Sequence, residues 1–465
     1  MAETSTNIGY IRFMLCPAVN YGMAFYPEGT DMFSMSGDVM WNQAYDRLGD
    51  GNGFQHAAGM WGYQSIVHET GHALGLKHPF DGANVLPTAE DIHFNTTMSY
   101  TGTWISLAQS PATPMAYDLL ALQYLYGARP KNSGDDVYRL TGLGTSQYTL
   151  NGTTWQPSQH QVKQAIWDSG GKDTIDASGL PFDSSGYRFD LRGGGRLVSV
   201  AYHPQGDGFQ GGCSLAFPFE PENFINSSSS DQIIANGSVN TFGGYTAGRV
   251  AGNDTLSGAS AADTLDLSAY SRSAVTATAV GSDLLLQFGS WGSVRVIDYY
   301  AGSRPSIAYA PSGTLFGTVR SGGQSLLGVT VTVGDVTAST DSNGIYSIAD
   351  IAVGTPVATY TKSGYVTQTK AVTIVAGSGT RADVDLEVIR HSLSYSAGAG
   401  GTITGTSLQT VTYNGSGTPV TAVPNIGYHF VSWSDGRSAN PRTDIGVAAD
   451  INVTAGFAIN TYTLK

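Results

Sequence analysis

The stretch HETGHALGLKH, residues 68–78, carries the most specific pattern in this 465-residue chain. His68 and His72 are four positions apart, so both imidazoles project from one face of a helix. Gly75 then allows the chain to leave the helix in a sharp turn, after which His78 can return as a third nitrogen ligand. Three neutral imidazoles suit zinc in a tetrahedral site whose fourth position holds water. The stretch therefore predicts a zinc-binding helix.

Glu69 directly follows the first of these histidines. A carboxylate in that place can take a proton from water, because zinc lowers the pKa of a bound water toward about 7. The alternative is a pair of helix histidines that bind no metal. With five positions specified, a chance match arises on the order of once per few million starting points, which favours the metal site.

Helical periodicity is convincing in two places, residues 63–76 and residues 116–126. The apolar face of the second helix consists of Leu119, Leu120, Leu122 and Leu125. From about residue 136 onward, short β-rich runs alternate with turn signals. The tripeptide Asp-Thr-Leu recurs nine residues apart, at Asp254 and Asp263, and this period is typical of calcium-binding parallel β-rolls.

The composition excludes several classes of protein. Charged residues make up 13% of the chain and the formal net charge is -13, which argues against a nucleic-acid partner and against an anionic membrane surface. No run of 18 or more apolar residues occurs, so we expect no membrane span. The first ten residues lack a basic and then apolar leader, so no signal peptide is expected there. Cys16 and Cys213 are expected to be two buried thiols, with a single disulfide as the alternative.

A second change of character occurs near Pro311. Residues 313–388 alternate strictly between apolar and polar positions, which predicts a small β-sandwich, and residues 391–459 have the same character. The last residues, NTYTLK, repeat the start of the second module and suggest the beginning of a further copy. Trp433 and Tyr428 could stack on sugars, but a place in the core of a small domain is favoured.

Residues 68–78 resemble the zinc signature of the metzincin metalloendopeptidases. Pro79 after the third histidine and the sequence TMSY at residues 97–100 resemble the serralysin-type family. The resemblance implies that Met98 lies in a Met-turn beneath the zinc, and that Tyr100 can ligate the metal or swing away from it. A core methionine and an ordinary buried phenol are the alternatives.

The resemblance covers about residues 8–300 and implies a multidomain chain. An α+β metzincin catalytic domain would occupy residues 1–130, and an all-β parallel β-roll or jelly-roll-like region residues 131–311. Two small β-sandwich-like modules would follow, with residues 312–389 similar to a carboxypeptidase regulatory-like domain and residues 390–465 similar to a bacterial surface repeat. The family's propeptide and its first catalytic strand and helix are not recognisable, so we expect the catalytic domain to be N-terminally incomplete.

The resemblance also implies about two structural calcium ions where the catalytic domain meets the β-roll. The implied ligands are Asn132, Gly134, Asp136, Asp168, Gly170 and Asp173 for one ion, and Gly171, Asp173 and Glu222 for the other. Carboxylates and loop carbonyls are the ligands that calcium prefers, although Asp and Gly also form plain turns. The β-roll repeats are worn to SSSSD and SGASAAD, so Asp231, Asp254 and Asp263 can equally be read as turn residues.

The implied function is a secreted, extracellular bacterial hydrolase, a metalloprotease with one catalytic zinc. Glu69 would be the general base, Tyr100 would stabilise the oxyanion, and a protein or peptide substrate would lie along an edge strand near Ala24 and Phe25. We expect a monomer whose terminal modules contact a cell surface or polysaccharide. Two alternatives remain: a surface-binding protein with a vestigial metal site, and an enzyme inactivated by the incomplete N-terminus.

Overall fold

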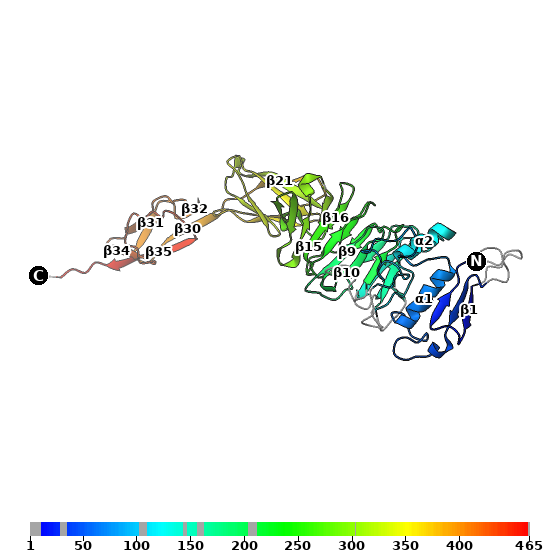
Figure 1. Cartoon of the computed structure of the whole chain (residues 1–465). Coiled ribbons are helices and arrows are strands. Elements are labelled where there is room, and N and C mark those ends of the chain that lie inside the picture. The colour runs from blue at the N-terminus through cyan, green and yellow to red at the C-terminus, as the bar shows by residue number, and fades with distance from the viewer. Residues whose placement is uncertain are drawn as a thin grey trace. The chain divides into compact units, whose positions relative to one another are not determined.

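The computed structural model describes residues 11–27, 35–101, 109–142, 147–155, 162–202, 212–302 and 304–463. The chain forms two compact units, Met1–Ala310 and Pro311–Lys465 (Figure 1). Within the described ranges the α-helices are α1 (Trp61–Ala73) and α2 (Ala116–Tyr126), both in the first unit. Short 3₁₀ turns occur at Gln43–Tyr45, Val200–Tyr202, Arg272–Ala274, Gly289–Trp291 and Tyr299–Ala301. This β-rich, multidomain architecture is consistent with the predicted β-roll.

The first unit begins with a three-stranded sheet beside α1 (Figure 1). Its strands are β1 (Arg12–Leu15), β2 (Gly22–Ala24) and β3 (Asp38–Trp41), in the order β1-β3-β2. Strand β3 runs parallel to β1 and antiparallel to β2. Val39 and Trp41 of β3 pack against Ala73 of α1, so the helix covers one face of this sheet.

Helix α1 ends three residues earlier than the periodicity predicts, at Ala73. Gly75 adopts a φ of 92°, the N–H of Gly75 donates to the carbonyl of His72, and the N–H of Leu76 donates to the carbonyl of Gly71. This pair of bonds is the Schellman arrangement, which satisfies the last carbonyls and reverses the chain. The reversal is what brings His78 back toward the helix.

Helix α2 has the predicted bounds, but its apolar face is not a buried face. Leu119 packs against the core of the β-rich region, whereas Leu120 is 41% exposed and Leu125 is 51% exposed. The buried side chains of this helix are Ala116 and Asp118. Periodicity identifies such a helix but not the side on which its neighbours pack.

Two sheets form the β-rich remainder of the first unit. One has the order β17-β18-β19-β15-β13-β9-β10-β11-β7, with β7 (Lys163–Ile166), β9 (Tyr187–Asp190), β10 (Arg196–Ser199), β11 (Gly212–Leu215), β13 (Gln232–Ile234), β15 (Gly252–Ser257), β17 (Thr276–Val280), β18 (Asp283–Gln287) and β19 (Gly292–Val296). The other has the order β20-β16-β14-β12-β8-β4-β5-β6, with β4 (Val137–Gly142), β5 (Gln147–Leu150), β6 (Thr153–Trp155), β8 (Thr174–Asp176), β12 (Asn223–Ile225), β14 (Thr241–Gly243), β16 (Thr264–Leu267) and β20 (Ser306–Tyr309).

Consecutive strands from β12 to β16 alternate between these two sheets, and within each sheet the rungs are parallel. The inward side chains form one core between the sheets, including Phe224, Ile233, Phe242, Leu256 and Leu265. An apolar residue at the centre of each short strand therefore produces a roll, in which each rung buries its apolar face against the opposite sheet.

A column of polar residues lines the start of the second sheet. Asp136, Asp173, Glu222, Asn240 and Asp263 directly precede β4, β8, β12, β14 and β16. Side-chain oxygens in this column accept backbone bonds from the preceding rung: Asp136 N–H donates to Asp173 Oδ1 at 3.0 Å, and Asp173 N–H donates to Glu222 Oε2 at 2.8 Å. Carboxylates thus satisfy the backbone of the turns that join the rungs.

The second unit contains two separate cores. The first lies between the sheet of β21 (Ser312–Ser321), β22 (Gln324–Ser325), β25 (Ile345–Ala352), β28 (Gly379–Arg381) and β29 (Val384–Asp385) and the sheet of β23 (Thr330–Val333), β24 (Val336–Ser339), β26 (Val357–Thr361) and β27 (Gln368–Ala371). The second belongs to β30 (Arg390–Ala397), β32 (Leu408–Thr412), β34 (Tyr428–Trp433) and β35 (Ile451–Ile459), with the pair β31 (Gly401–Thr404) and β33 (Thr421–Pro424). Trp433 is 1% exposed, which confirms its predicted place in a core.

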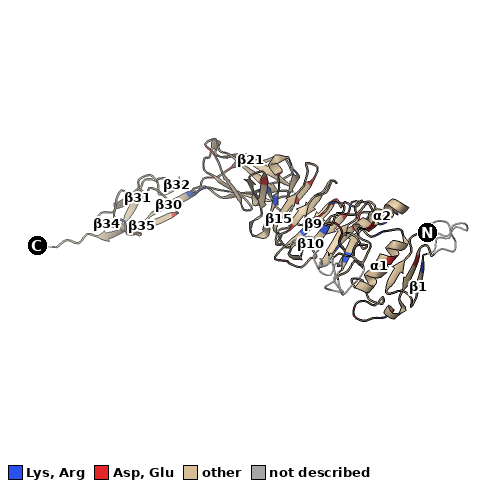
Figure 2. Ribbon diagram, viewed as in Figure 1, with Lys and Arg blue, Asp and Glu red and all other residues tan. Residues whose placement is uncertain are grey.

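The cysteines are free thiols, and Cys213 is buried as predicted. Cys16 is half-buried, so the expectation of two buried thiols is wrong for this residue, which lies at the end of the partly exposed strand β1. Neither helix in the described ranges has the length and apolarity needed to cross a bilayer. Figure 2 shows acidic and basic residues interspersed along the ribbon of the first unit.

Candidate metal centres

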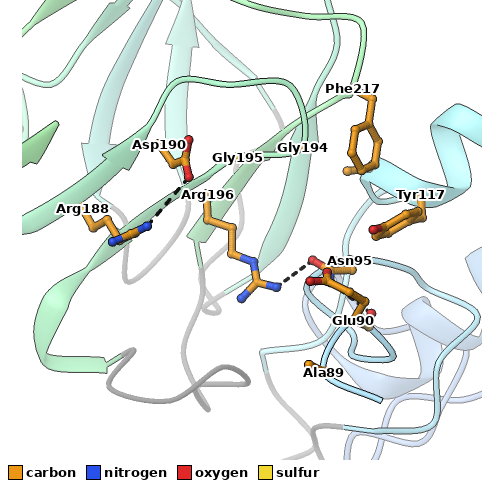
Figure 3. A pocket seen from close by; sticks show the side chains of 11 residues that line it. Ala89, Glu90, Asn95, Tyr117, Arg188, Asp190, Gly194, Gly195, Arg196 and Phe217 are labelled. Carbon is orange, nitrogen blue, oxygen red and sulfur yellow. Dashed lines mark hydrogen bonds and ion pairs between the residues drawn. The ribbon is translucent and has the colours of Figure 1, made fainter. Parts of the chain in front are cut away.

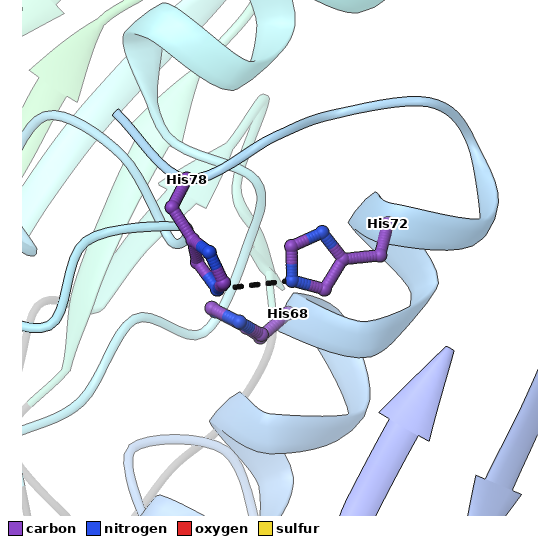
Figure 4. A group of neighbouring side chains, drawn as sticks. All are labelled: His68, His72 and His78. Carbon is purple, nitrogen blue, oxygen red and sulfur yellow. Dashed lines mark hydrogen bonds between the residues drawn. The ribbon is translucent and has the colours of Figure 1, made fainter. Parts of the chain in front are cut away.

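Three imidazoles converge at the end of α1 (Figure 4). His68 and His72 project from neighbouring turns of the helix, and His78 returns after the Gly75 reversal. One ligand nitrogen from each ring lies within 4.8 Å of the other two, and His72 Nε2 lies 3.1 Å from His78 Nε2. The predicted zinc ligands are therefore close neighbours in the structure.

The outer nitrogen of each ring has an acceptor of its own. His68 Nδ1 bonds the carbonyl of Thr97 at 2.8 Å, His72 Nδ1 bonds the carbonyl of Leu76 at 2.7 Å, and His78 Nδ1 bonds Asp81 Oδ2 at 2.8 Å. An acceptor at Nδ1 holds the proton there and leaves the Nε2 lone pair free. The three lone pairs then point into one space.

This arrangement fits a zinc ion. Zinc–nitrogen bonds of about 2.0–2.1 Å at tetrahedral angles place two ligand nitrogens roughly 3.3 Å apart, close to the His72–His78 separation. Burial lowers the pKa of His68 to about 3 and also lowers the pKa of His72. Both rings are therefore neutral at physiological pH, and no proton competes with the metal for these two nitrogens.

Glu69 follows His68 on α1 and faces strand β2. Burial raises the pKa of its carboxyl to about 7, and the N–H of Ala24 donates a hydrogen bond to it that opposes this shift. Gly22 of β2 is also close, since a Cβ at that position would lie 3.3 Å from Glu69 Cγ. The carboxylate is therefore held between the metal helix and the strand edge.

The backbone groups of β2 point alternately into the sheet and away from it. Phe25 donates its N–H to Asp38 and accepts at its carbonyl from Gly37, so both of its backbone groups are used inside the sheet. Gly22 and Ala24 alternate with it and direct their backbone groups to the other side. Of the two predicted substrate-edge residues, Ala24 faces the site, whereas Phe25 has no backbone group left for a substrate strand.

Met98 lies against α1 at Gly71, with 2% of its surface exposed. A Cβ at Gly71 would lie 2.7 Å from Met98 Sδ, so glycine at this point of α1 permits the close approach. This buried position is compatible with both predictions for Met98, a residue of the core and a residue of a Met-turn.

A buried carboxylate that the sequence analysis did not identify supports this turn. Asp118 of α2 accepts hydrogen bonds from Thr96 Oγ1, Thr97 N–H, Thr97 Oγ1 and Met115 N–H, at 2.5–2.8 Å. Thr97 is the residue whose carbonyl bonds His68 Nδ1. An aspartate in an otherwise apolar helix is the sequence signal that could have identified it.

Aromatic rings surround the imidazoles. Tyr100 is 49% exposed, and its ring centroid lies 4.6 Å from that of His78 and 5.7 Å from that of His68. Phe80 stacks on His78 at 5.0 Å, and Tyr26 meets His72 edge-on at 5.4 Å. Burial is the largest cause that raises the pKa of Tyr100, so its phenol keeps its proton at neutral pH.

Two cavities lie near this part of the chain. One of about 720 Å³ is mainly apolar and lies between the loop after Gly75 and the exposed face of α2, with His78 and Met98 in its wall. The other, of about 420 Å³, is lined by none of the three histidines (Figure 3). There Arg196 donates to Asn95 Oδ1 at 2.9 Å and Arg188 pairs with Asp190 at 3.8 Å, so its charged groups have partners within the protein.

A second cluster lies where the β-rich region begins. Asp136, Asp168 and Asp173 are buried and bring carboxylate oxygens within 4.8 Å of one another. Burial, and then the neighbouring carboxylates, raise the pKa of Asp173 to about 7, and burial raises the pKa of Asp168. Asp136 Oδ2 is buried and has no hydrogen-bond partner within the described chain. An orphaned oxygen among crowded carboxylates fits a calcium ion.

The other predicted calcium ligands lie around this cluster in different roles. The amide of Asn132 donates to the Tyr138 hydroxyl, which in turn donates to Asp168 Oδ2 at 2.5 Å. Gly171 has a φ of 121°, and a Cβ there would lie 1.9 Å from the carbonyl oxygen of Gly134. The loop of Gly134 and the loop of Gly170 and Gly171 therefore lie in direct contact. Glu222 touches the cluster through Asp173 N–H.

The acids of the worn repeats differ from this cluster. Asp263 accepts from Asn240 N–H at 2.7 Å and from Ser260 N–H at 2.6 Å, one bond for each carboxylate oxygen. Asp231 and Asp254 likewise accept protein hydrogen bonds at both oxygens. These three aspartates therefore act as turn residues whose carboxylate oxygens accept hydrogen bonds from the protein. The sequence did not identify the backbone and hydroxyl groups that donate these bonds.

Comparisons with known proteins agree with the β-rich part of this description. Residues 132–288 match the family model of the peptidase M10 serralysin C-terminal region, and residues 391–461 match that of the divergent InlB B-repeat domain. Serralysin of Proteus mirabilis is 37% identical over 39% of this chain and 37% of its own length. Serralysin A of Dickeya chrysanthemi is 32% identical over 46% of this chain and 43% of its own length, and serralysin of Photorhabdus luminescens is 29% identical over 51% and 48%.

The chain spans less than half the length of these curated relatives. The similarity is therefore partial, and it is supported most directly in the roll. Residues 132–288 are similar to a serralysin C-terminal region, and the chain is similar to serralysins over part of its length.

Proposed function

We propose that this chain is a secreted bacterial zinc endopeptidase that hydrolyses peptide bonds of extracellular proteins. The observation that carries the proposal is the convergence of one ligand nitrogen from each of three imidazoles, on rings whose Nδ1 atoms bond outer acceptors. Zinc held there by His68, His72 and His78 would supply a Lewis acid that lowers the pKa of water toward about 7.

The residues around that point have complementary roles. Glu69 accepts the proton of the attacking water and passes it to the leaving amine, with its carboxylate held by Ala24 N–H. The backbone groups of Gly22 and the carbonyl of Ala24 pair with an extended substrate. Tyr100 donates a hydrogen bond to the carbonyl oxygen as negative charge develops on it.

We assign a structural role to the junction carboxylates. Calcium bound by Asp136, Asp168 and Asp173 would neutralise their repulsion and join the strand starts of the roll. Asn132, Gly134, Gly170, Gly171 and Glu222 complete the proposed neighbourhood. Residues 1–130 would then act as the catalytic domain and residues 131–311 as the calcium-stabilised roll.

The test is hydrolysis of casein by the purified chain, with and without a zinc-selective chelator and with calcium held constant. We expect activity that the chelator abolishes and added zinc restores. Glu69→Gln should bind zinc without hydrolysing casein. Failure of the zinc-loaded wild type to cleave casein or gelatin would contradict the proposal.

A second function, binding to a surface, is favoured by the match of residues 391–461 to a repeat-domain model. In that case the modules at residues 312–389 and 390–465 would carry the activity and the histidines would be vestigial. A chain ending at Ser312 distinguishes the two functions. If the protease proposal is right, this chain keeps its turnover of a short peptide, since His68, His72 and His78 all belong to the first unit.

A further inference from the structure

The loop between β14 and β15 places an arginine against the turn of a neighbouring rung. Arg249 Nη1 donates to the carbonyl of Gly244 at 2.7 Å and to Asn226 Oδ1 at 3.1 Å, and its Nη2 donates to the carbonyl of Asn226 at 2.9 Å. Three oxygens from two successive turns thus surround one guanidinium group.

The two turns are equivalent positions of adjacent rungs. Strand β12 ends at Ile225 and β14 ends at Gly243, and these two residues are Cα partners in the parallel ladder. Asn226 and Gly244 are the next residue on each rung. A cation between them therefore joins successive turns of the roll.

The acids beside this group are also fully engaged. Asp254 Oδ2 accepts from Asn226 Nδ2 at 3.1 Å and from Tyr245 OH at 2.9 Å, while its Oδ1 accepts from Asp231 N–H at 2.9 Å. Asp231 Oδ2 accepts from the hydroxyl of Ser227 at 2.7 Å. The sequence SSSSD at residues 227–231, which lacks the glycines of a calcium repeat, supplies two of these donors, the hydroxyl of Ser227 and the N–H of Asp231.

We propose that the oxygens of Asn226 and Gly244 form a cation site of the roll, and that its ligand is the guanidinium of Arg249 in place of calcium. The fixed planar fork of a guanidinium can reach two carbonyls and an amide oxygen at once, whereas an ammonium group is a single point charge. The positive charge also interacts with the carboxylate of the buried Asp231. This part of the roll is then held without metal, whether or not the chain is a protease.

The experiment uses the full chain with calcium chelated, and it follows amide hydrogen exchange at Asn226 and Asp231, whose N–H groups bond the adjacent rungs. Arg249→Ala should raise exchange at both amides by at least tenfold. About 20 mM ethylguanidinium should restore protection, because it returns the fork to the vacated oxygens, and ethylammonium should not. Arg249→Lys is a milder change. It should cause a smaller loss of amide protection, and ethylguanidinium should not restore that protection.

The matched control is Arg188→Ala on strand β9, because that guanidinium makes an ion pair at 3.8 Å with Asp190 and is partly exposed. It should leave exchange at Asn226 and Asp231 within a factor of two. Two results would overturn the proposal: unchanged exchange in both Arg249 variants, or a loss in Arg249→Ala that ethylammonium reverses as well as ethylguanidinium does. Calcium-dependent protection of these amides in the wild-type chain would overturn it as well.

Discussion

The three-histidine centre and the junction carboxylates each bring three ligand atoms within 4.8 Å of one another, but burial lowers the pKa of two imidazoles in the first and raises the pKa of two carboxyls in the second. Burial makes two of the imidazoles weak bases, so their nitrogens are ready for a cation at neutral pH. Burial and repulsion from neighbouring carboxylates make Asp168 and Asp173 weak acids, so Asp173 holds a proton until about pH 7. The first site is preorganised, whereas the second must lose protons to bind.

The difference teaches how each site should respond to its metal. A preorganised nitrogen site with an open position suits chemistry. A crowded carboxylate site gains most of its order from the ion itself, and therefore suits stabilisation. The Arg249 site is a third solution, in which the cation is covalently part of the chain and no metal is required.

The largest effect should come from Glu69→Gln, which removes the proton acceptor but retains the three imidazoles. We expect peptide turnover to fall by about 10³- to 10⁴-fold, the upper part of the range for general-base catalysis. Zinc content should stay near one ion per chain, measured by metal analysis after dialysis. Glu387→Gln, at an exposed position of the second unit, is the control and should behave as wild type. Near-normal turnover in Glu69→Gln would show that Glu69 is not the general base of the reaction.

Tyr100→Phe should have a smaller effect on the same assay. It removes one hydrogen bond to the developing negative charge, and water can partly replace that bond because Tyr100 is half-exposed. We expect kcat to fall by about 10²-fold, the lower end of the range for an oxyanion donor, with KM nearly unchanged. A rise in KM at constant kcat would assign Tyr100 to substrate binding instead.

Asp173→Asn should affect stability rather than turnover. Calcium at a hundred times its dissociation constant stabilises a native protein by about 2.7 kcal/mol. For the wild type this should raise Tm by about 5 °C, and Asp173→Asn should abolish most of that shift. Asp266→Asn on β16 of the same sheet is the control that should retain it. An undiminished shift in Asp173→Asn would place calcium elsewhere.

The smallest effect, and the sharpest test of the comparison, is the pH dependence of the calcium shift. Because the pKa of Asp173 is raised in the folded, metal-free chain, the stability that its proton contributes is complete below the unfolded pKa of about 3.9 and is lost as pH rises through about 7. Calcium must displace this proton. The calcium-induced rise in Tm should therefore be larger at pH 8 than at pH 5.5, as melting curves at fixed zinc can show. An equal rise at both values would contradict proton competition.

The amino-acid sequence was sufficient to predict elements whose geometry depends on spacing. His68 and His72 share a helix face whatever the surroundings, and Gly75 permits the reversal that returns His78. The bounds of α2 and the alternation of apolar residues in the roll follow from the same local rules.

Contacts made across the fold were not predictable in this way. The support of Thr97 by Asp118 depends on how α2 docks, and periodicity is silent on docking. The exposure of Leu120 and Leu125 has the same origin. The sequence of the degenerate repeats shows that their glycines are absent. It does not show that Arg249 replaces a metal, because that contact depends on a loop that returns to the turn of another rung.

Zinc titration into the metal-free chain, with turnover of a quenched peptide followed at constant calcium, tests the central claim most directly. The account predicts that activity rises linearly and stops at one equivalent of zinc per chain, and that calcium alone restores none. Activity that is already complete before zinc is added, or that does not appear at any zinc concentration in a folded chain, would contradict it.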